Sequence, residues 1–298
     1  ARFYLADTFP KEYRNRLFMC NIHEHAVLTD VMKPAGSSFI GQHGDDFMPT
    51  NDLAWVGFSV EIGPEGGVYI LDWHDTDVCG NAVNFPNSGR VYRIMPENAK
   101  PVTCPDLGEM SDLELVDLQN HSNDWFVRQA RTLLHYRSAS ENLDRPAVHA
   151  ALAKNFETAR SSPKRLRALW ALQVTGGLPE AKLLQLLTHQ DQYVRGWAIQ
   201  FLGDDSSIHA FANSTDSDSP SLTNTIIDRL ASMAHSDPSP IVRLYLSAAV
   251  QRLPFKQRWP ILQGLVAHSE DIADNNLPRM YWFGIEPMVV KHPQEALD

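Results

Sequence analysis

The chain has 298 residues, of which 43% are hydrophobic and 21% charged, a composition typical of a protein with a hydrophobic core. Its 26 basic and 36 acidic residues give a net charge of −10, which argues against nucleic-acid binding because that function needs a basic surface. No apolar run approaches the ~18 residues of a membrane-spanning segment. Because the sequence starts at Ala1 rather than Met, we expect a fragment or a processed chain, in which a missing signal peptide says little about location.

The three cysteines are Cys20, Cys79 and Cys104, and none of them forms a CxxC pair. The sequence therefore contains no motif for a cysteine zinc site, and we expect no covalent haem in this chain. Cys79 and Cys104 flank the last predicted strand. Two alternatives stay open for them, a disulfide bond or isolated thiols.

Residues 1–100 predict a β domain of short strands separated by turns. Runs rich in Val, Ile, Phe and Tyr lie at 16–22, 26–32, 38–42, 58–62, 68–73 and 90–95. Gly63–Gly67 contains a proline and three glycines, which predict a tight hairpin between 58–62 and 68–73. Residues 90–95 would form the next strand of the same sheet. Such sheets suit the blades of a β-propeller, and about two blades are expected here, too few to close a ring.

Residues 101–298 predict a second, helical domain. Ser111–Glu114 reads Ser-Asp-Leu-Glu, which is a capping-box sequence for the first helix. A motif then recurs in which a turn with Asp precedes a Val and an Arg of the next helix. Its copies are 123–130, 190–198 and, more loosely, 236–246, and 165–173 resembles a further helix of the same kind.

We expect the Asp of this motif to cap its helix, the Val to enter the core, and the Arg to reach back to the preceding turn. The pattern is typical of HEAT or armadillo repeats, whose helix pairs stack into a solenoid. Five tryptophans fall at core spacing in these helices: Trp125, Trp170, Trp197, Trp259 and Trp282.

An acidic stretch runs through the β domain. Residues 34–89 contain no Lys or Arg, but they contain two histidines and eight acids: Asp45, Asp46, Asp52, Glu61, Glu65, Asp72, Asp75 and Asp77. No local base can neutralise these carboxylates, so they pair with Arg from elsewhere, are solvated, bind a cation or act in catalysis. Ca²⁺ is the cation that converging carboxylates would suit, although no EF-hand spacing is present. The candidate metal ligands are Asp45, Asp46 and Asp75.

The candidate catalytic residues are His43, His74 and Asp72. His43 lies between two glycines, which let a ligand approach the backbone closely, and His is the usual proton-transfer residue near neutral pH. His74 follows the strand that contains Asp72, where a propeller presents its pocket loops. The candidate substrate-binding residues are Asp52, Trp73 and His23, and Trp73 would either stack on a sugar or anchor one blade against another.

Four stretches together resemble one protein family: Phe9–His23, Gly41–Phe47, Gly63–Thr76 and Ser88–Ile94. The chain resembles the large secreted proteins of planctomycetes and their relatives that are described as membrane-bound dehydrogenases. In that family a glucose/sorbosone-dehydrogenase-like β-propeller is followed by HEAT-like repeats, and usually by a c-type cytochrome with a CxxCH motif. This chain departs from the pattern because it has no CxxCH and about a third of a propeller.

The resemblance implies a periplasmic or secreted oxidoreductase, whose propeller pocket oxidises a sugar or an alcohol and passes electrons to a haem elsewhere in the full protein. It implies pyrroloquinoline quinone as the cofactor, by analogy with soluble sugar dehydrogenases. We expect this chain alone to be inactive. The alternative is a non-enzymatic protein that binds a carbohydrate through the propeller or a protein partner through the solenoid. Glycoside hydrolysis by two carboxylates would need a separation of ~5–9.5 Å, which a sequence does not give.

Overall fold

The computed structural model of the protein describes residues 1–77, 82–100, 102–204, 222–291 and 293–294. The predicted order is confirmed: antiparallel sheets fill the N-terminal part and helices follow. The chain forms two compact units, one of residues 1–33 with 40–154, and one of residues 34–39 with 155–298. The first unit therefore contains the second sheet, most of the first sheet and the first helices, while residues 34–39 of the β3–β4 hairpin belong to the second unit. Among the described residues, no helix combines the length and the hydropathy needed to cross a membrane.

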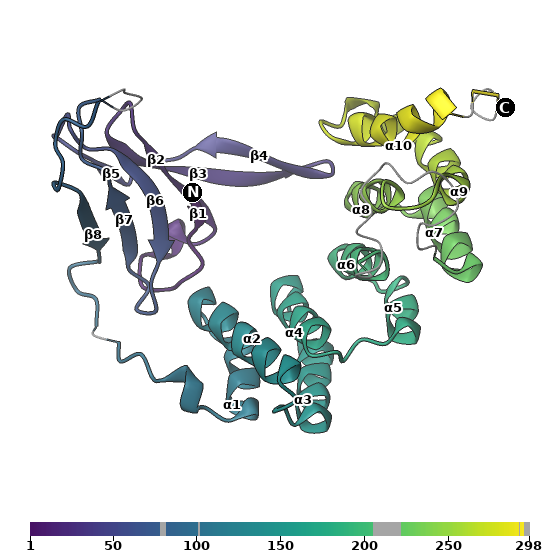
Figure 1. The fold of residues 1–298 in the computed structure, drawn as a ribbon, viewed down its shortest axis with the longest axis horizontal. Coiled ribbons are helices and arrows are strands. Elements are labelled where there is room, and N and C mark those ends of the chain that lie inside the picture. Colours follow the sequence, from purple (N-terminus) through teal and green to yellow (C-terminus); the bar gives the residue numbers. More distant parts are fainter. Residues whose placement is uncertain (78–81, 101, 205–221, 292, 295–298) are drawn as a thin grey trace. The chain divides into compact units, whose positions relative to one another are not determined.

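Two antiparallel sheets make up the β part (Figure 1). In the first sheet the strand order is β1-β2-β3-β4, and β5 pairs with β3. Its strands are β1 (Arg2–Phe3), β2 (Arg16–Asn21), β3 (Ala26–Ala35), β4 (Ser38–His43) and β5 (Met48–Pro49). The second sheet has the order β6-β7-β8, with strands β6 (Gly57–Ile62), β7 (Val68–Asp72) and β8 (Arg90–Ile94).

The second sheet buries one face and exposes the other, as period-two alternation predicts. Along β7 the side chains of Val68, Ile70 and Asp72 are buried, whereas Leu71 is exposed. The buried face joins Tyr4, Phe18 and Trp55 in one hydrophobic core. The opposite face of the sheet therefore presents side chains to solvent, and this face becomes important for the candidate site.

The predicted hairpin between β6 and β7 is confirmed. Gly63 donates a backbone hydrogen bond to Gly67 at 3.0 Å, and Gly66 adopts a φ of +79°, a conformation that glycine tolerates best. The turn residues at 63–67 therefore form the tight turn that the sequence predicts. The predicted disulfide alternative involves Cys79, which lies outside the described residues, while Cys20 and Cys104 are free thiols.

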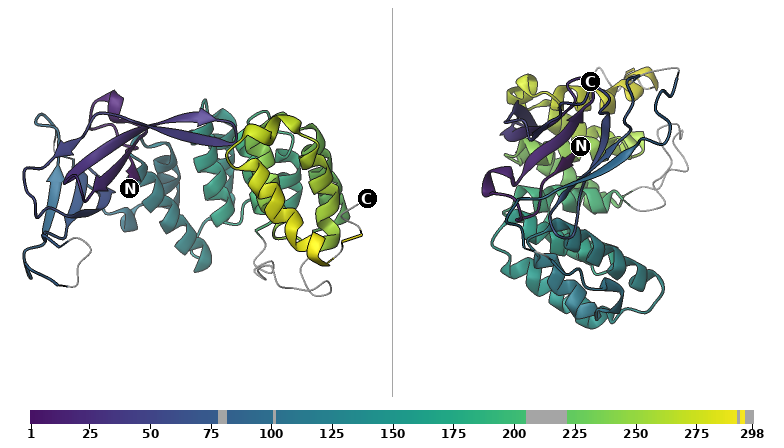
Figure 2. Two further views of the ribbon diagram at one scale, coloured as in Figure 1. Left: turned by 90° about the horizontal axis from the view of Figure 1, so that it is seen from above. Right: turned by 90° about the vertical axis from the view of Figure 1, so that its left-hand side faces the viewer.

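The α-helices begin after the last strand, whereas one short 3-10 helix, η1 (Lys11–Tyr13), lies between β1 and β2. The first unit contains η1, η2 (Leu107–Glu109), α1 (Asp112–Asp117), η3 (Leu118–Asn120) and α2 (Asp124–Ala139), and α3 (Arg145–Thr158) extends from it into the second unit. The second unit contains α4 (Ser162–Val174), α5 (Glu180–Leu186), α6 (Gln192–Leu202), α7 (Asn224–Ser236), α8 (Pro240–Val250), α9 (Phe255–Val266), η5 (Ser269–Ala273) and α10 (Leu277–Lys291). Figure 2 shows these elements from two further directions.

The expected capping is partly confirmed. Ser111 and Glu114 form the predicted capping box at α1, and Asp191 caps α6 by accepting the backbone N–H of Tyr193. In the other two copies of the motif the prediction was wrong by one or two positions. Asn123 caps α2 and Ser239 caps α8, because these residues directly precede the first helical turn.

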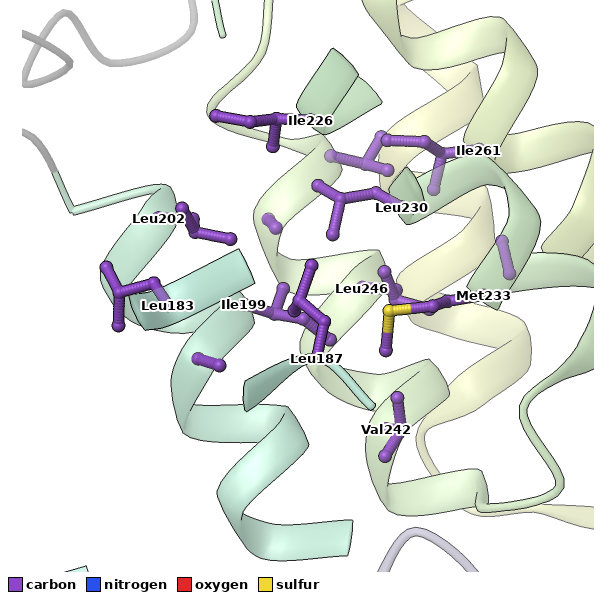
Figure 3. Close-up of a cluster of buried hydrophobic side chains, with 14 of the residues drawn as sticks. Leu183, Leu187, Ile199, Leu202, Ile226, Leu230, Met233, Val242, Leu246 and Ile261 are labelled. Carbon is purple, nitrogen blue, oxygen red and sulfur yellow. The ribbon is translucent and has the colours of Figure 1, made fainter. Parts of the chain in front are cut away.

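A buried core of aliphatic side chains joins the helices of the second unit (Figure 3). Val194 and Val242 of the repeated motif are both fully buried, as predicted. Trp170, Trp197 and Trp259 pack against this core, and the rings of Trp170 and Trp197 meet edge to face with centroids 5.2 Å apart. The prediction of a core position is wrong for Trp282, because its side chain on α10 is 54% exposed.

Three arginines of the second unit, Arg165, Arg195 and Arg243, form the same set of contacts, which we call the Arg–Asp ladder. Each of these arginines donates to a backbone carbonyl six residues before it, in the turn that precedes its helix, as predicted. Its carboxylate partner, however, lies in a turn later in the chain and not in the preceding turn. This forward contact links α4 to the turn before α6, α6 to the turn before α8, and α8 to η5. The pairs are Arg165–Asp191, Arg195–Asp237 and Arg243–Asp271, and the carbonyls belong to Ala159, His189 and Asp237.

Within the first unit, Asn123 joins the first helices to the sheet. Its Oδ1 caps α2, and its Nδ2 donates to the carbonyl oxygens of Gly63 and Pro64 at 3.0 and 2.9 Å. The backbone N–H of Asp124 also donates to the carbonyl of Leu5. An aspartate at position 123 would cap the helix equally well, but it has no donor for the two carbonyls.

We predict that Asn123→Asp lowers the free energy of unfolding by about 2 kcal/mol, because a carboxylate would face two buried carbonyl oxygens. Urea unfolding followed by circular dichroism measures this loss. Asn98→Asp, the same substitution on an exposed loop, is the matched control and should change stability by less than about 0.5 kcal/mol. Equal effects of the two substitutions would show that Asn123 does not join sheet and helix.

Candidate functional site

Several of the predicted site residues meet at one end of the second sheet. Asp72 ends β7, and Trp73 and His74 follow it directly. Asp52 comes from the loop before β6. Arg90, which the sequence interpretation did not assign to the site, begins β8 and is the cross-strand partner of Asp72.

Asp72 is an anchor rather than a free carboxylate. Its side chain is fully buried, and Oδ1 accepts the backbone N–H groups of Val56 and His74 at 2.8 and 2.9 Å. Its Oδ2 accepts Nε of Arg90 at 2.8 Å. Because both oxygens are occupied by donors, Asp72 holds the turn after β7 in place and is poorly suited to act as a general base.

The expectation that no local base neutralises the acidic stretch is wrong. Arg90 lies one residue beyond the stretch, and antiparallel pairing of β7 with β8 places it opposite Asp72. Its Nη2 also donates to Oδ2 of Asp52 at 2.7 Å. This hydrogen bond, with the one from the backbone N–H of Ala54, holds the pKa of Asp52 below its ordinary value. Asp52 is therefore an ionised, half-exposed carboxylate near neutral pH.

His74 lies beside this charge cluster in an unusual backbone conformation, with a φ of +53°. Its Nε2 is 3.6 Å from Oδ2 of Asp52, and its ring stacks on Phe85 with centroids 5.8 Å apart. Its Nδ1 is buried and has no hydrogen-bond partner among the described residues. His74 and Asp52 thus form a partly exposed pair that could move a proton.

Asp75 holds the loop that follows. Its side chain accepts the backbone N–H groups of Asp77, Asn84 and Phe85 at 3.0, 2.8 and 3.3 Å, and it also accepts Nδ2 of Asn84 at 3.0 Å. The hydrogen bond from Asp77 is the largest cause of a lowered pKa at Asp75. The carboxylate is therefore a structural acceptor within this loop.

The other predicted ligands have different surroundings. Asp45 has a 93% exposed side chain and lies 3.7 Å from Nη1 of Arg16, while Asp46 lies 3.4 Å from Nε2 of His43. In the described part of the chain, no group of three His, Cys, Asp or Glu side chains is arranged to hold a metal ion. The described geometry thus offers Ca²⁺ no preformed cluster of carboxylates.

His43 and His23 do not join the cluster at the end of the second sheet. His43 lies on β4, exposed, with Nδ1 3.5 Å from Oδ1 of Asp30. His23 is exposed in the turn between β2 and β3, where its backbone N–H donates to Oδ1 of Asn21. No hydrogen bond or ion pair of the described residues links either histidine to Arg90.

An apolar pocket lies on the exposed face of the second sheet, beside this cluster. It has a volume of about 340 Å³ and a lining that is mostly apolar. Trp73, 56% exposed, and Phe58, 58% exposed, meet edge to face with ring centroids 6.5 Å apart. The remaining lining residues are Leu71, Asp72, Val83, Phe85, Pro86, Asn87, Gly89, Arg90 and Val91.

The exposure of Trp73 separates it from the other tryptophan of the β part. Trp55 is fully buried in the core between the sheets, where an anchor is expected. Trp73 instead presents its ring to the pocket. The sequence alone left both roles open for Trp73, because alternation after the end of a strand does not fix which face a side chain takes.

The family described as "Domain of unknown function (DUF7133)" matches residues 1–98, which include every predicted site residue. This match covers the two sheets, and its description names no activity. No curated protein matches the chain. Function must therefore be argued from the geometry of the site.

We predict that Asp72→Ala lowers the free energy of unfolding by about 3 kcal/mol, because it leaves two backbone N–H groups and Arg90 without their acceptor. This value is at the lower end for a buried pair because a third of the Arg90 side chain is exposed. Thermal and urea unfolding measure the loss, with the exposed Asp45→Ala as the control. A change as small as that of the control would contradict the anchoring role.

The lowered pKa of Asp75 predicts a pH dependence with a definite sign. The stabilisation that the ionised Asp75 carboxylate provides is fully present above its unfolded-state pKa of about 3.9. It is lost as the pH falls through the lower pKa that Asp75 has in the folded protein. The thermal midpoint of the wild type should therefore drop more between pH 5 and pH 2 than that of Asp75→Asn, which cannot ionise. Parallel curves for the two proteins would contradict the role of this carboxylate.

Proposed function

We propose that the exposed face of the second sheet binds an uncharged, hydroxyl-rich ligand, a sugar or a polyol, at Trp73. The observation that carries this proposal is the exposed Trp73 ring, which forms part of an apolar pocket beside polar side chains. An exposed apolar patch of this kind is unusual on a surface without a binding role. The volume of about 340 Å³ is within the range of small-molecule sites.

The chemistry of the lining suits a sugar. The apolar C–H face of a sugar ring packs on an aromatic ring such as that of Trp73, and its hydroxyl groups need polar partners at the edge of that contact. Arg90 can supply one, because its Nη1 forms no hydrogen bond among the described residues. The exposed Asn87 lines the same pocket and has both a donor and an acceptor.

The charge of the pocket favours a neutral ligand. Its lining contains one acid and one base, Asp72 and Arg90, and these two residues are paired with each other. A strongly anionic ligand would compete with Asp52 and Asp72 for Arg90, and a cation would lie against the guanidinium group. Neither cost arises for a ligand that carries hydroxyl groups alone.

In this proposal the two sheets are blades of a β-propeller and the helices form a HEAT-like solenoid, in a protein that is secreted or periplasmic. The antiparallel pairing of β6, β7 and β8 and the repeated Arg–Asp ladder support this finer description. The solenoid would then offer a second surface, to a protein partner. The resemblance to secreted dehydrogenase-like proteins motivates the location.

Oxidation of the bound sugar or alcohol is the second candidate function, favoured by the His74–Asp52 pair at 3.6 Å. Because Nε2 faces the Asp52 carboxylate, the neutral ring carries its proton on Nε2, and the nitrogen that would accept a hydroxyl proton is the buried Nδ1. The described residues do not fit pyrroloquinoline quinone, which carries three carboxylates, because Arg90 is the single base that lines the pocket and it is already paired. No oxidative step is therefore assigned to this chain.

We predict that Trp73→Ala weakens binding of a monosaccharide or polyol at least about tenfold, equivalent to about 1.4 kcal/mol. Calorimetric titration with a panel of neutral sugars measures this loss. Trp282→Ala is a closely matched control, because Trp282 is 54% exposed but lies on α10 of the second unit. Wild-type affinity in Trp73→Ala, or an equal loss in both variants, would overturn the proposed site.

Dye-linked oxidation of the same panel, with added quinone, separates the two candidates. The binding function predicts calorimetric heats without turnover. Sustained turnover that is lost in His74→Gln would instead support the oxidoreductase.

A further inference from the structure

The exposed face of the second sheet continues beyond the Trp73 pocket. Because side chains alternate along a strand, Tyr69, Leu71 and Trp73 project on the same side of β7 and its extension. On β8 the cross-strand neighbours are Arg93 opposite Tyr69 and Val91 opposite Leu71. Leu71 and Val91 therefore form an apolar pair on this face, and the polar pair of Tyr69 and Arg93 lies two residues further along each strand.

A second pocket lies at this polar end of the face. It has a volume of about 500 Å³, and Tyr69 and Arg93 both line it. The Tyr69 hydroxyl donates to Oε1 of Glu65 in the β6–β7 hairpin. The other lining residues are Pro64, Glu65, Met95, Pro96, Glu97, Ala99, Lys100 and Val102. This pocket thus combines an aromatic ring with several hydrogen-bonding groups, as the first pocket does.

The two pockets together carry no net charge. Their linings contain three acids and three bases, which cancel (3 − 3 = 0): Glu65, Asp72 and Glu97 with Arg90, Arg93 and Lys100. The chain as a whole has a net charge of −10, so this balance is local. It suits an uncharged polar ligand along the whole face and disfavours a polyanion or a polycation.

The spacing of the two pockets exceeds the reach of one small ligand. Tyr69 and Trp73 are four residues apart along an extended backbone, which corresponds to about 13 Å at a rise of about 3.3 Å per residue. A single sugar ring that stacks on Trp73 therefore leaves the Tyr69 pocket free. A chain of linked sugars lying along β7 would occupy both.

We propose that the two pockets are subsites of one groove that binds an extended, uncharged polysaccharide chain. The inference rests on the proposed function, since it assigns the ligand class of the same face. Strand addition by a peptide is a poorer match, because that mode uses the free backbone groups of a sheet edge, whereas both pockets lie on side chains of the face. The Trp73 pocket provides the apolar platform, and the Tyr69 pocket extends the contact.

The test is a calorimetric series with cello- and manno-oligosaccharides of one to six units, on the wild type, Trp73→Ala and Tyr69→Ala. Affinity should rise with length until both pockets are filled. Tyr69→Ala should leave monosaccharide binding unchanged but weaken hexasaccharide binding about tenfold, whereas Trp73→Ala should weaken both. Tyr136→Ala, at a 65% exposed tyrosine of α2, is the control and should change neither. Circular dichroism of each variant verifies folding.

The possible failures are distinguishable. If monosaccharides bind at Trp73 but hexasaccharides bind no more tightly, the extended groove is wrong and the proposed function stands. If no neutral sugar binds the wild type, both are wrong. If sedimentation shows a dimer that Trp73→Ala dissociates, the face is an interface between copies of the chain, which also overturns the groove.

Discussion

The cross-strand pair of Asp72 and Arg90 is the interaction on which the candidate site depends. The carboxylate receives Nε of Arg90 at 2.8 Å and two backbone N–H groups, one of which belongs to His74. The guanidinium extends the contact to Asp52, which lies on a different loop. One buried carboxylate thus fixes three segments of chain at the end of the second sheet. The free-energy cost of burying the Asp72 carboxylate is offset because all of its hydrogen-bond partners are donors.

The pair also decides which chemistry the end of the sheet can support. It removes Asp72 from the list of available bases, and it places one guanidinium against two of the eight acids in a stretch that has no base of its own. What remains accessible is the Trp73 ring, a guanidinium nitrogen of Arg90 that has no hydrogen bond within the described part of the chain, and the partly exposed His74–Asp52 pair. These groups suit recognition of an uncharged ligand better than binding of a cation. In our proposal the second sheet is a binding surface, and the internal Asp72–Arg90 ion pair supports it.

Much of the fold follows from local sequence patterns. The positions of the main strands, the Gly63–Gly67 hairpin and the Ser111–Glu114 capping box follow from turn chemistry and from period-two or helical spacing. The end of β3, which extends to Ala35 instead of residue 32, and the two-residue strand β5 were not predicted. Contacts between segments were harder to predict. The forward direction of the ladder from Arg195 to Asp237 depends on how one helix pair stacks on the next, which a single motif does not contain. The exact capping residue was also hard to predict, because the Asp of the motif does not lie directly before the first helical turn in every copy.

The site could be predicted in part for the same reason. Asp72, Trp73 and His74 were identified from their position at the end of a strand and Asp52 from the acidic stretch, and the structure brings the four together. Arg90 was missed because it lies outside the acidic stretch. The antiparallel register of β7 and β8, which the hairpin pattern already implied, was the signal that could have found it. The exposure of Trp73 depends on tertiary packing, so the sequence could not separate a platform from an anchor.

The most direct test of the central claim follows the tryptophan indole N–H signals by nuclear magnetic resonance during titration with a neutral sugar. The claim predicts that the signal of Trp73 shifts in a saturable manner with the amide signals of Leu71 and Val91, while those of the buried Trp55 and the exposed Trp282 stay in place. Shifts confined to the helices between Asp112 and Lys291, or no shifts at saturating sugar, would contradict it.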